Sequence, residues 1–279
     1  MCGIAFIINY SNNKLNLSFV KNIFCFMEER GTNASGIYFE RGILGKMERR
    51  IIKAPLKASD LWKETQLIKD INEENKKYIL DGTEKLILLH TRQKTTGTEF
   101  DNLNNHPIFS EKYVLVHNGI ISDDSKVKDY KYLGQVDSEH ILANLETLGL
   151  NGFKNVYGGM AAIFKKFKED KIFLLRNYNP LFLCYFKDLN VLIGISDIDF
   201  VSNNIQARKT LFKKLTEEKE FKSVELPKNE LYTIRIDKFH INKIKDIEVP
   251  SCKPFKWQKG NRWYYDKQLN INKWMEADD

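Results

Sequence analysis

The chain has 279 residues, of which 42% are hydrophobic and 12% aromatic, enough to bury a substantial core as one large domain or two small ones. Its first apolar run, residues 2–8, has no basic segment before it, and no stretch approaches the ~20 apolar residues that span a bilayer. We therefore expect no signal peptide, no membrane contact and a cytoplasmic location.

The net charge and the spacing of the cysteines bear on three further possibilities: nucleic-acid binding, a disulfide framework and a metal site. The net charge is +7, which a lysine-rich surface explains. Nucleic-acid binding is an alternative that no zinc-finger spacing, RNA-binding aromatic motif or arginine cluster supports. Irregular cysteine spacing predicts free thiols rather than a disulfide framework or a CxxC metal site, and we expect neither a metal nor another cofactor. The cysteines are Cys2, Cys25, Cys184 and Cys252.

Apolar periodicity in the first half of the chain predicts strands mixed with amphipathic helices. The helix at 137–150 has Asp137 or Ser138 as its candidate N-cap. The elements expected before it are a strand at 2–9, a helix at 17–30 ending near Gly31, strands at 35–40 and 44–52, a charged helix at 58–78, and strands at 85–91 and 112–121.

The second half is richer in strands. Four closely spaced apolar runs at 160–167, 171–177, 181–186 and 190–196 are typical of an antiparallel meander. A helix at 203–220 and a final strand pair at 230–237 and 239–245 follow. Because the strands form two groups with helices between and around them, we expect two sheets face to face with helices outside. The aromatic and basic tail, residues 246–279, either packs on the domain or serves as a contact surface.

Cys2 is the first residue that could carry chemistry. Cysteine is small enough that we expect the initiator Met1 to be removed, which leaves the thiol beside a free α-amine. An α-amine with a pKa near 8 can act as a general base at neutral pH. The alternative is that Cys2 is only a small hydrophobic residue at the start of a buried strand.

Three further motifs contain candidate binding residues. Arg92 follows an apolar strand and could capture a carboxylate with both guanidinium nitrogens, or it could be an ordinary surface arginine. Asn118 and Gly119 could form a type I′ hairpin turn, or they could supply the side-chain and backbone donors of an oxyanion hole. Asp137 could cap a helix or bind a substrate ammonium group.

Taken in order, these motifs resemble those of the class II glutamine amidotransferases, which are N-terminal-nucleophile hydrolase domains. The resemblance covers about residues 2–240 and implies an α+β fold, a four-layer αββα sandwich of two mainly antiparallel sheets. It also implies a domain at 2–245 followed by the tail at 246–279. The motifs are CGI at 2–4, RGTNASG at 30–36, HTR at 90–92, NHP at 105–107, HNG at 117–119 and DSE at 137–139.

The resemblance implies a role for each residue of these motifs. Cys2 would attack the side-chain carboxamide of L-glutamine, and the resulting thioester would be hydrolysed, so that the products are glutamate and ammonia. Opposite charges would hold the α-carboxylate and α-ammonium groups, which selects a free amino acid. The implied assignments are oxyanion binding by Asn118 and Gly119, carboxylate binding by Arg92 with Thr95, ammonium binding by Asp137, and support by Arg30, His106 and His117.

Two positions depart from the family pattern. The sequence also shows no place for a synthase that would use the ammonia. Gln93 replaces an aromatic residue that shields the site, and Asn33 replaces the usual Asp. Relatives usually fuse this domain to a synthase that consumes the ammonia, so we expect a separate synthase chain as partner. The alternatives are a glutaminase without such a partner, an N-terminal-nucleophile amidase acting on another amide, and a catalytically idle domain retained for binding or regulation.

Overall fold

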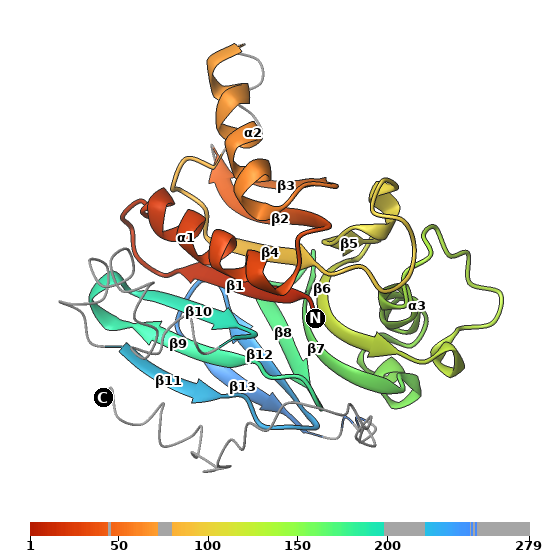
Figure 1. The fold of residues 1–279 in the computed structure, drawn as a ribbon. Coiled ribbons are helices and arrows are strands. Elements are labelled where there is room, and N and C mark those ends of the chain that lie inside the picture. Colours follow the sequence, from red (N-terminus) through yellow and green to blue (C-terminus); the bar gives the residue numbers. More distant parts are fainter. Residues whose placement is uncertain (44–45, 72–79, 198–220, 246, 248, 250–279) are drawn as a thin grey trace, which may run out of the picture.

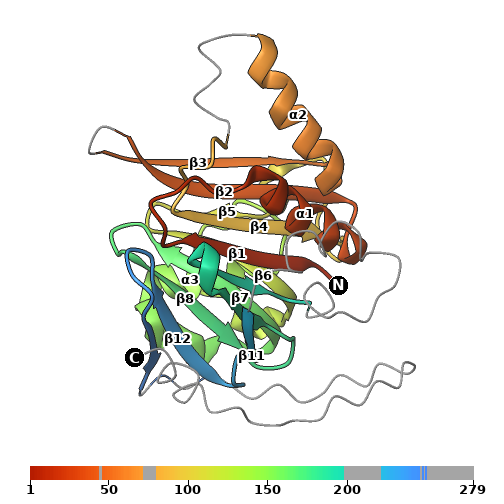
Figure 2. The same ribbon diagram turned by 90° about the vertical axis from the view of Figure 1, so that its left-hand side faces the viewer.

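A computed structural model describes the whole chain except residues 44–45, 72–79, 198–220, 246, 248 and 250–279. The helix expected at 203–220 and nearly all of the tail at 246–279 lie outside the described residues. The described residues form two antiparallel sheets, called here sheet A and sheet B, which stack face to face (Figures 1 and 2).

Sheet A has seven strands in the order β11-β9-β10-β1-β4-β2-β3, and every neighbouring pair is antiparallel. The N-terminal strand β1 lies at its centre, between β10 and β4. The strands are β1 (Gly3–Asn9), β2 (Ala34–Ile43), β3 (Lys46–Ala54), β4 (Leu86–Arg92), β9 (Phe182–Phe186), β10 (Val191–Ile195) and β11 (Phe221–Glu225).

Sheet B has six strands in the order β13-β12-β8-β7-β6-β5, again with antiparallel neighbours only. Its longest pairing joins β6 to β7 over the full length of both strands. The strands are β5 (Ile108–Phe109), β6 (Tyr113–Ile121), β7 (Gly158–Lys166), β8 (Lys171–Arg176), β12 (Glu230–Arg235) and β13 (Ile241–Ile244).

Strand β1 shows why the sequence builds a layered core. All seven of its residues are buried, and successive side chains point to opposite faces. Ile4, Phe6 and Ile8 enter the core between the two sheets, whereas Ala5 and Ile7 enter the core under the helices. A strand covered on both faces needs the near-continuous apolar run that the sequence contains.

Helices cover the outer face of each sheet. Helix α1 (Leu17–Met27) and the first turns of helix α2 (Ala58–Ile71) lie over sheet A, and helix α3 (Ser138–Leu148) lies over sheet B. The rest of α2 projects away from the sheet (Figures 1 and 2). The side chain of Asn16 caps α1 by accepting a hydrogen bond from the backbone N–H of Ser18 at 2.9 Å. The predicted four-layer αββα sandwich is therefore confirmed.

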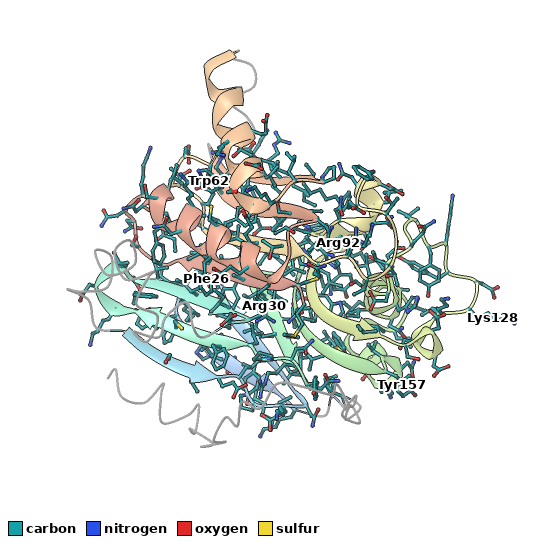
Figure 3. All side chains as sticks on the ribbon, viewed as in Figure 1. Phe26, Arg30, Trp62, Arg92, Lys128 and Tyr157 are labelled. Atoms are coloured by element: carbon teal, nitrogen blue, oxygen red, sulfur yellow. The ribbon has the colours of Figure 1, made fainter. Side chains whose placement is uncertain are left out.

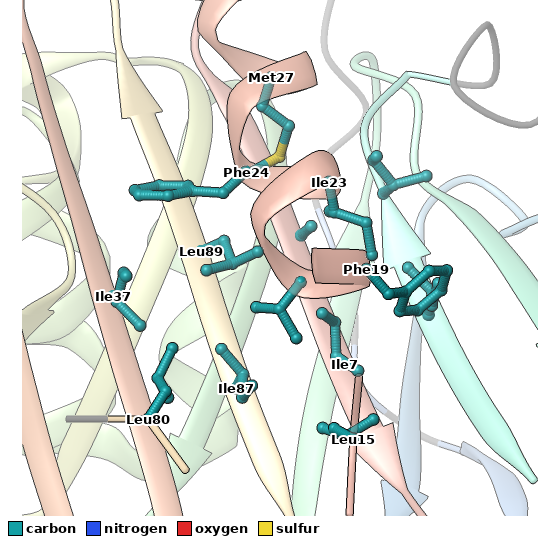
Figure 4. Close-up of a cluster of buried hydrophobic side chains, with 14 of the residues drawn as sticks. Ile7, Leu15, Phe19, Ile23, Phe24, Met27, Ile37, Leu80, Ile87 and Leu89 are labelled. Atoms are coloured by element: carbon teal, nitrogen blue, oxygen red, sulfur yellow. The ribbon is translucent and has the colours of Figure 1, made fainter. Parts of the chain in front are cut away.

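The contact between α1 and sheet A illustrates the energetics of these layers. Phe19, Ile23, Phe24 and Met27 recur at helical spacing and all point onto the sheet (Figure 4). Each such side chain contributes ~1.5–3 kcal/mol by leaving water, so this face secures the sheet that carries the N-terminus.

The expected meander is wrong in one respect. β7 and β8 pair in sheet B, whereas β9 and β10 pair in sheet A, so the four strands form two hairpins in two different sheets. The chain crosses between Asn177, whose N–H bonds Met160 O at 3.0 Å, and Leu181, which is buried between the sheets. Local spacing reveals strands but not the sheet that each strand joins.

Two short strands went unpredicted: β5 has only two residues, and β11 begins directly after the helix expected at 203–220. No helix among the described residues is long and apolar enough to cross a membrane.

Candidate active site

Cys2 lies at the start of β1, where the centre of sheet A meets the end of β4. Gly3 pairs with Thr91, so Cys2 lies beside the last residue of β4 (Figure 1). The thiol of Cys2 is 3.7 Å from the carbonyl oxygen of Gln93. Arg30 donates from Nε to the Cys2 carbonyl at 3.0 Å and pairs with Asp197 at 3.1 Å, so the arginine assigned a supporting role does lie against the N-terminus (Figure 3).

The surroundings of Cys2 keep its thiol protonated. Burial raises the pKa of the Cys2 thiol, and the negative charge of Asp137 raises it further, while the amino terminus and Arg92 act in the opposite direction. A thiol in this environment needs a base to accept its proton before it becomes a nucleophile. Arg92 and Asp137 lie close enough to Cys2 to influence it, so the structure brings these three predicted residues together.

Arg92 is not an ordinary surface arginine, because only 3% of it is exposed. Its guanidinium donates to Asn105 Oδ1 at 2.9 Å and to the carbonyl of Gly97 at 3.0 Å, and it also bonds the carbonyl of Thr96. These three acceptors hold the cation in one orientation beside Cys2.

Both departures from the family pattern meet at the loop after Arg92: Gln93 lies in this loop, and Asn33 contacts it. The backbone N–H of Lys94 donates to Asn33 Oδ1 at 3.0 Å, so the amide at position 33 holds this loop against the site. Gln93 lies beside Cys2 with an exposed side chain. Thr95, expected to help bind a carboxylate, is exposed and makes no hydrogen bond within the described residues.

Asn118 and Gly119 lie inside β6 and not in a hairpin turn, so the type I′ turn is excluded. They pair with Ala161 and Met160 of β7. Asn118 is 1% exposed, yet neither atom of its side-chain amide has a hydrogen-bond partner within the described residues. Such a group costs ~1–3 kcal/mol, which makes it a sign of function.

Gly119 has a backbone conformation that other residues rarely adopt. Its φ angle is 154°, and a Cβ atom there would lie 1.9 Å from the carbonyl oxygen of Gly159. The strand therefore needs glycine at this position. The carbonyl of Asn118 accepts a hydrogen bond from Asn179 Nδ2 at 2.7 Å, which fixes the peptide unit between Asn118 and Gly119.

Asp137 occupies the N-cap position of α3, but its side chain does not cap the helix. Its Oδ2 atom instead accepts a hydrogen bond from the backbone N–H of Ile121 at 2.6 Å. This contact anchors the carboxylate two residues beyond Gly119. Ser138 is also not the cap, because it belongs to α3 and its hydroxyl lies 2.8 Å from His117 Nδ1.

His90, His106 and His117 are buried and lie next to one another. His90 Nε2 is 3.1 Å from the carbonyl oxygen of His117, and the rings of His90 and His106 stack with centroids 4.2 Å apart. Burial lowers the pKa of all three, that of His90 to about 3, so they are neutral at physiological pH. No group of three His, Cys, Asp or Glu residues in the described part of the chain could hold a metal ion.

Sequence reasoning missed several residues that shape the site. Asn105 lies in the NHP motif and so had a signal, whereas Asn179 lies outside the six motifs. Lys53 had none, because its Nζ bonds the carbonyls of two distant residues, Asn105 and Pro107. Glu139 lies in the DSE motif, and it accepts hydrogen bonds from the N–H groups of the nearby residues Leu133 and Gly134.

Comparison with curated proteins finds regions similar to this chain in two kinds of enzyme. A probable glutamine–fructose-6-phosphate aminotransferase (isomerizing) of Acanthamoeba polyphaga mimivirus is 27% identical over 198 residues, or 66% of this chain. The glutamine–fructose-6-phosphate aminotransferase (isomerizing) of Mesorhizobium japonicum is 31% identical over 199 residues, or 65% of this chain. A 7-cyano-7-deazaguanine synthase of Sulfolobus acidocaldarius is 30% identical over 146 residues, or 46% of this chain.

The match covers only 29–31% of the length of each of these relatives. The similarity therefore concerns one region of much longer proteins. No protein-family model matches the chain.

Solved structures give the same fold. The glutamine phosphoribosylpyrophosphate amidotransferase of B. subtilis, in complex with ADP and GMP, superposes with a TM-score of 0.59 at 13% identity, over 88% of this chain and 50% of the other. A structure described as the allosteric regulatory enzyme of purine biosynthesis gives a TM-score of 0.61 at 14% identity, with the same coverage. The predicted N-terminal-nucleophile hydrolase architecture is thereby confirmed.

Proposed function

Because this chain belongs to the class II glutamine amidotransferase domain family, we propose that it hydrolyses L-glutamine to glutamate and ammonia through a thioester on Cys2. The observation that carries the proposal is the buried, unpartnered amide of Asn118, together with the charges of Arg92 and Asp137 that act on the Cys2 thiol. A polar group without a partner, at a position where charge would develop, is suited to a transition state.

The first step needs a free α-amine on Cys2. Met1 is 74% exposed, which gives an aminopeptidase access to it. With Met1 removed, the amine accepts the thiol proton while the sulfur bonds to the carboxamide carbon. The C–N bond then breaks, the amide nitrogen takes the proton, and ammonia leaves. Water hydrolyses the thioester, which releases glutamate and restores the thiol.

The oxyanion of the tetrahedral intermediate would be held by two donors on β6. The Asn118 amide supplies one N–H and the Gly119 backbone the other. A single donor of this kind is worth ~3 kcal/mol of barrier, or 10²–10³ in kcat. The φ angle of Gly119 and the hydrogen bond from Asn179 to the Asn118 carbonyl fix the peptide unit that supplies the Gly119 donor.

Recognition of a free amino acid follows from the opposite charges at the two sides of the site. Arg92 would bind the α-carboxylate and Asp137 the α-ammonium. A peptide-bound glutamine or a simple amide lacks both charges and would leave the two groups unpaired. This pair of charges favours glutamine over the alternative of an amidase acting on another amide.

We further propose that the ammonia is used by a separate synthase chain that binds the acceptor. The named reactions of the curated relatives belong to proteins of which the matching region is only a part. Beside the site, exposed apolar side chains offer a contact surface, because large exposed hydrophobic residues mark interaction sites. They are Phe100, Leu103 and Leu133.

The decisive experiment is labelling with a diazoketone analogue of glutamine, read out by intact and peptide mass. We expect Met1 to be absent and one adduct on Cys2. Cys2→Ala should abolish the adduct, whereas Cys25→Ala, at another half-buried free thiol, should leave it unchanged. Retention of Met1 with labelling of other thiols only would contradict the proposed mechanism. Glutamate release with and without added hydroxylamine then measures turnover.

A further inference from the structure

Lys53 connects an edge strand of sheet A to the segment behind Arg92. It lies on β3 and pairs with Gly36 of β2. A Cβ atom on Gly36 would be 2.1 Å from the carbonyl oxygen of His106 and 2.9 Å from the Cβ atom of Lys53. The absence of a side chain at position 36 therefore lets the segment 105–107 lie directly against β2 and β3.

The ammonium group of Lys53 binds this segment through its backbone. Nζ donates to the carbonyl oxygen of Asn105 at 2.7 Å and to that of Pro107 at 3.1 Å. It also lies 5.6 Å from the centre of the Phe109 ring. Lys53 forms no ion pair within the described residues, so its charge serves to hold neutral carbonyl groups.

Burying the charged ammonium group of Lys53 costs free energy, so we infer that this charge has a function. Burial lowers the pKa of Lys53 to about 8, although the negative charges of Asp101 and Glu139 favour its protonated form. The other titratable neighbours are the neutral histidines His90 and His106. An uncharged side chain of similar length would avoid this cost if the position required only packing.

A second contact carries the effect of Lys53 into the site. The Oδ1 atom of Asn105 accepts the hydrogen bond from Arg92 Nη1 at 2.9 Å. The carbonyl of the same Asn105 is held by Lys53. One residue therefore joins the lysine to the guanidinium, and a shift of Asn105 would turn Arg92 away from its ligand.

We propose that Lys53 is a positioning residue for recognition of the α-carboxylate of glutamine: by holding the backbone of the 105–107 segment it keeps Asn105, and through it Arg92, in the binding orientation. The inference rests on the proposed function, because it assumes that Arg92 binds glutamine. Lys53 itself touches neither the substrate nor Cys2. Its role is to lower the concentration of glutamine at which the site fills.

The test compares two reagents that alkylate Cys2. The diazoketone analogue of glutamine carries an α-carboxylate, whereas iodoacetamide does not. In Lys53→Met, which keeps the chain length but loses the charge and the donors, half-saturation for the diazoketone should rise at least tenfold. The rate of iodoacetamide labelling at Cys2, measured on the Cys2 peptide, should change by less than twofold. A general loosening of the structure would alter both rates.

Three further variants complete the test. Lys53→Arg retains the charge and can donate to both carbonyls, so its half-saturation should stay within threefold of the wild-type value. In an Arg92→Met background, Lys53→Met should add less than twofold, because the residue through which it acts is gone. Lys53→Gln, with the thermal midpoint measured alongside, replaces Lys53→Met if that variant does not fold, and the same tenfold rise is expected.

The outcomes separate this inference from the proposed function. If wild-type Cys2 does not react with the diazoketone, the proposed function fails and the inference fails with it. If wild-type Cys2 reacts and Lys53→Met gives the same half-saturation, only the inference is overturned. Equal slowing of both reagents would assign Lys53 a purely structural role and would also overturn it.

Discussion

Strands β4 and β6 carry two buried polar residues of the candidate site, Arg92 and Asn118, whose side chains differ in their hydrogen bonding. The Arg92 guanidinium has three acceptors within the protein: the carbonyls of Thr96 and Gly97 and the side chain of Asn105. The Asn118 amide, equally buried, has none within the described residues. The Arg92 side chain is fixed by its hydrogen-bond partners, whereas the Asn118 side chain has no such partner among the described residues.

The difference fits the two kinds of interaction proposed for these residues. A group that binds a ground-state ligand is best held rigid before the ligand arrives, because ordering it later costs binding energy. A donor meant for a transition state must instead remain free until charge develops. The fold holds the backbone of Asn118, through Asn179 and the pairing with β7, while its side chain stays unpartnered.

Replacement of Asn118 should give the largest effect. In Asn118→Leu, which has similar volume and no donor, we expect kcat for glutamine hydrolysis to fall 10²–10³-fold, while KM changes little. The thermal midpoint should not fall, because an unpartnered buried amide is replaced by an apolar group. Steady-state kinetics and calorimetry measure the two effects. A fall in stability without loss of kcat would assign Asn118 to the core.

Arg92→Lys should act on binding instead of turnover. The lysine keeps the charge but loses the fork that reaches three acceptors, so KM should rise about 10²-fold, equivalent to ~3 kcal/mol. The variant should also unfold at a lower temperature than wild type, unlike Asn118→Leu. Equal effects of the two substitutions on kcat and KM would remove the distinction between the two regions.

The neutral histidines behind both regions predict a dependence of stability on pH. The pKa of His90 is lowered to about 3, so between pH 6.5 and 3 the unfolded chain binds a proton that the folded chain does not. Stability is therefore lost as the pH falls, by ~2 kcal/mol between pH 7 and 5 from His90 alone. Urea unfolding at several pH values measures the slope. His90→Gln should reduce it, and an unchanged slope would mean that His90 does not contribute.

The smallest effect is expected at the exposed part of the loop after Arg92. Lys94 Nζ lies 2.8 Å from Glu99 Oε2, but 45% of the lysine side chain is exposed. Solvent-exposed pairs of this kind contribute little. Lys94→Ala should change KM by less than twofold, so a tenfold change would show that the loop, and not only the Arg92 network, controls binding.

The sequence predicted most strands and helices close to their observed positions, because apolar periodicity is a local property. It could not assign the strands to sheets. Ala5 pairs with Ile195 from the far end of the domain, and β8 and β9 separate into different sheets although only a few residues join them. Long-range pairing decides these contacts, and no local pattern records it.

The sequence by itself determined which residues could act: a cysteine at position 2, an arginine after a buried strand, and the Asn118-Gly119 pair. Only the tertiary structure decided where each is placed and what it contacts. It placed Asn118 inside a strand instead of a turn, directed Asp137 to the N–H of Ile121 instead of its own helix, and brought Lys53 to the segment behind Arg92. The physical reason is that hydrogen-bond satisfaction depends on neighbours from distant parts of the chain.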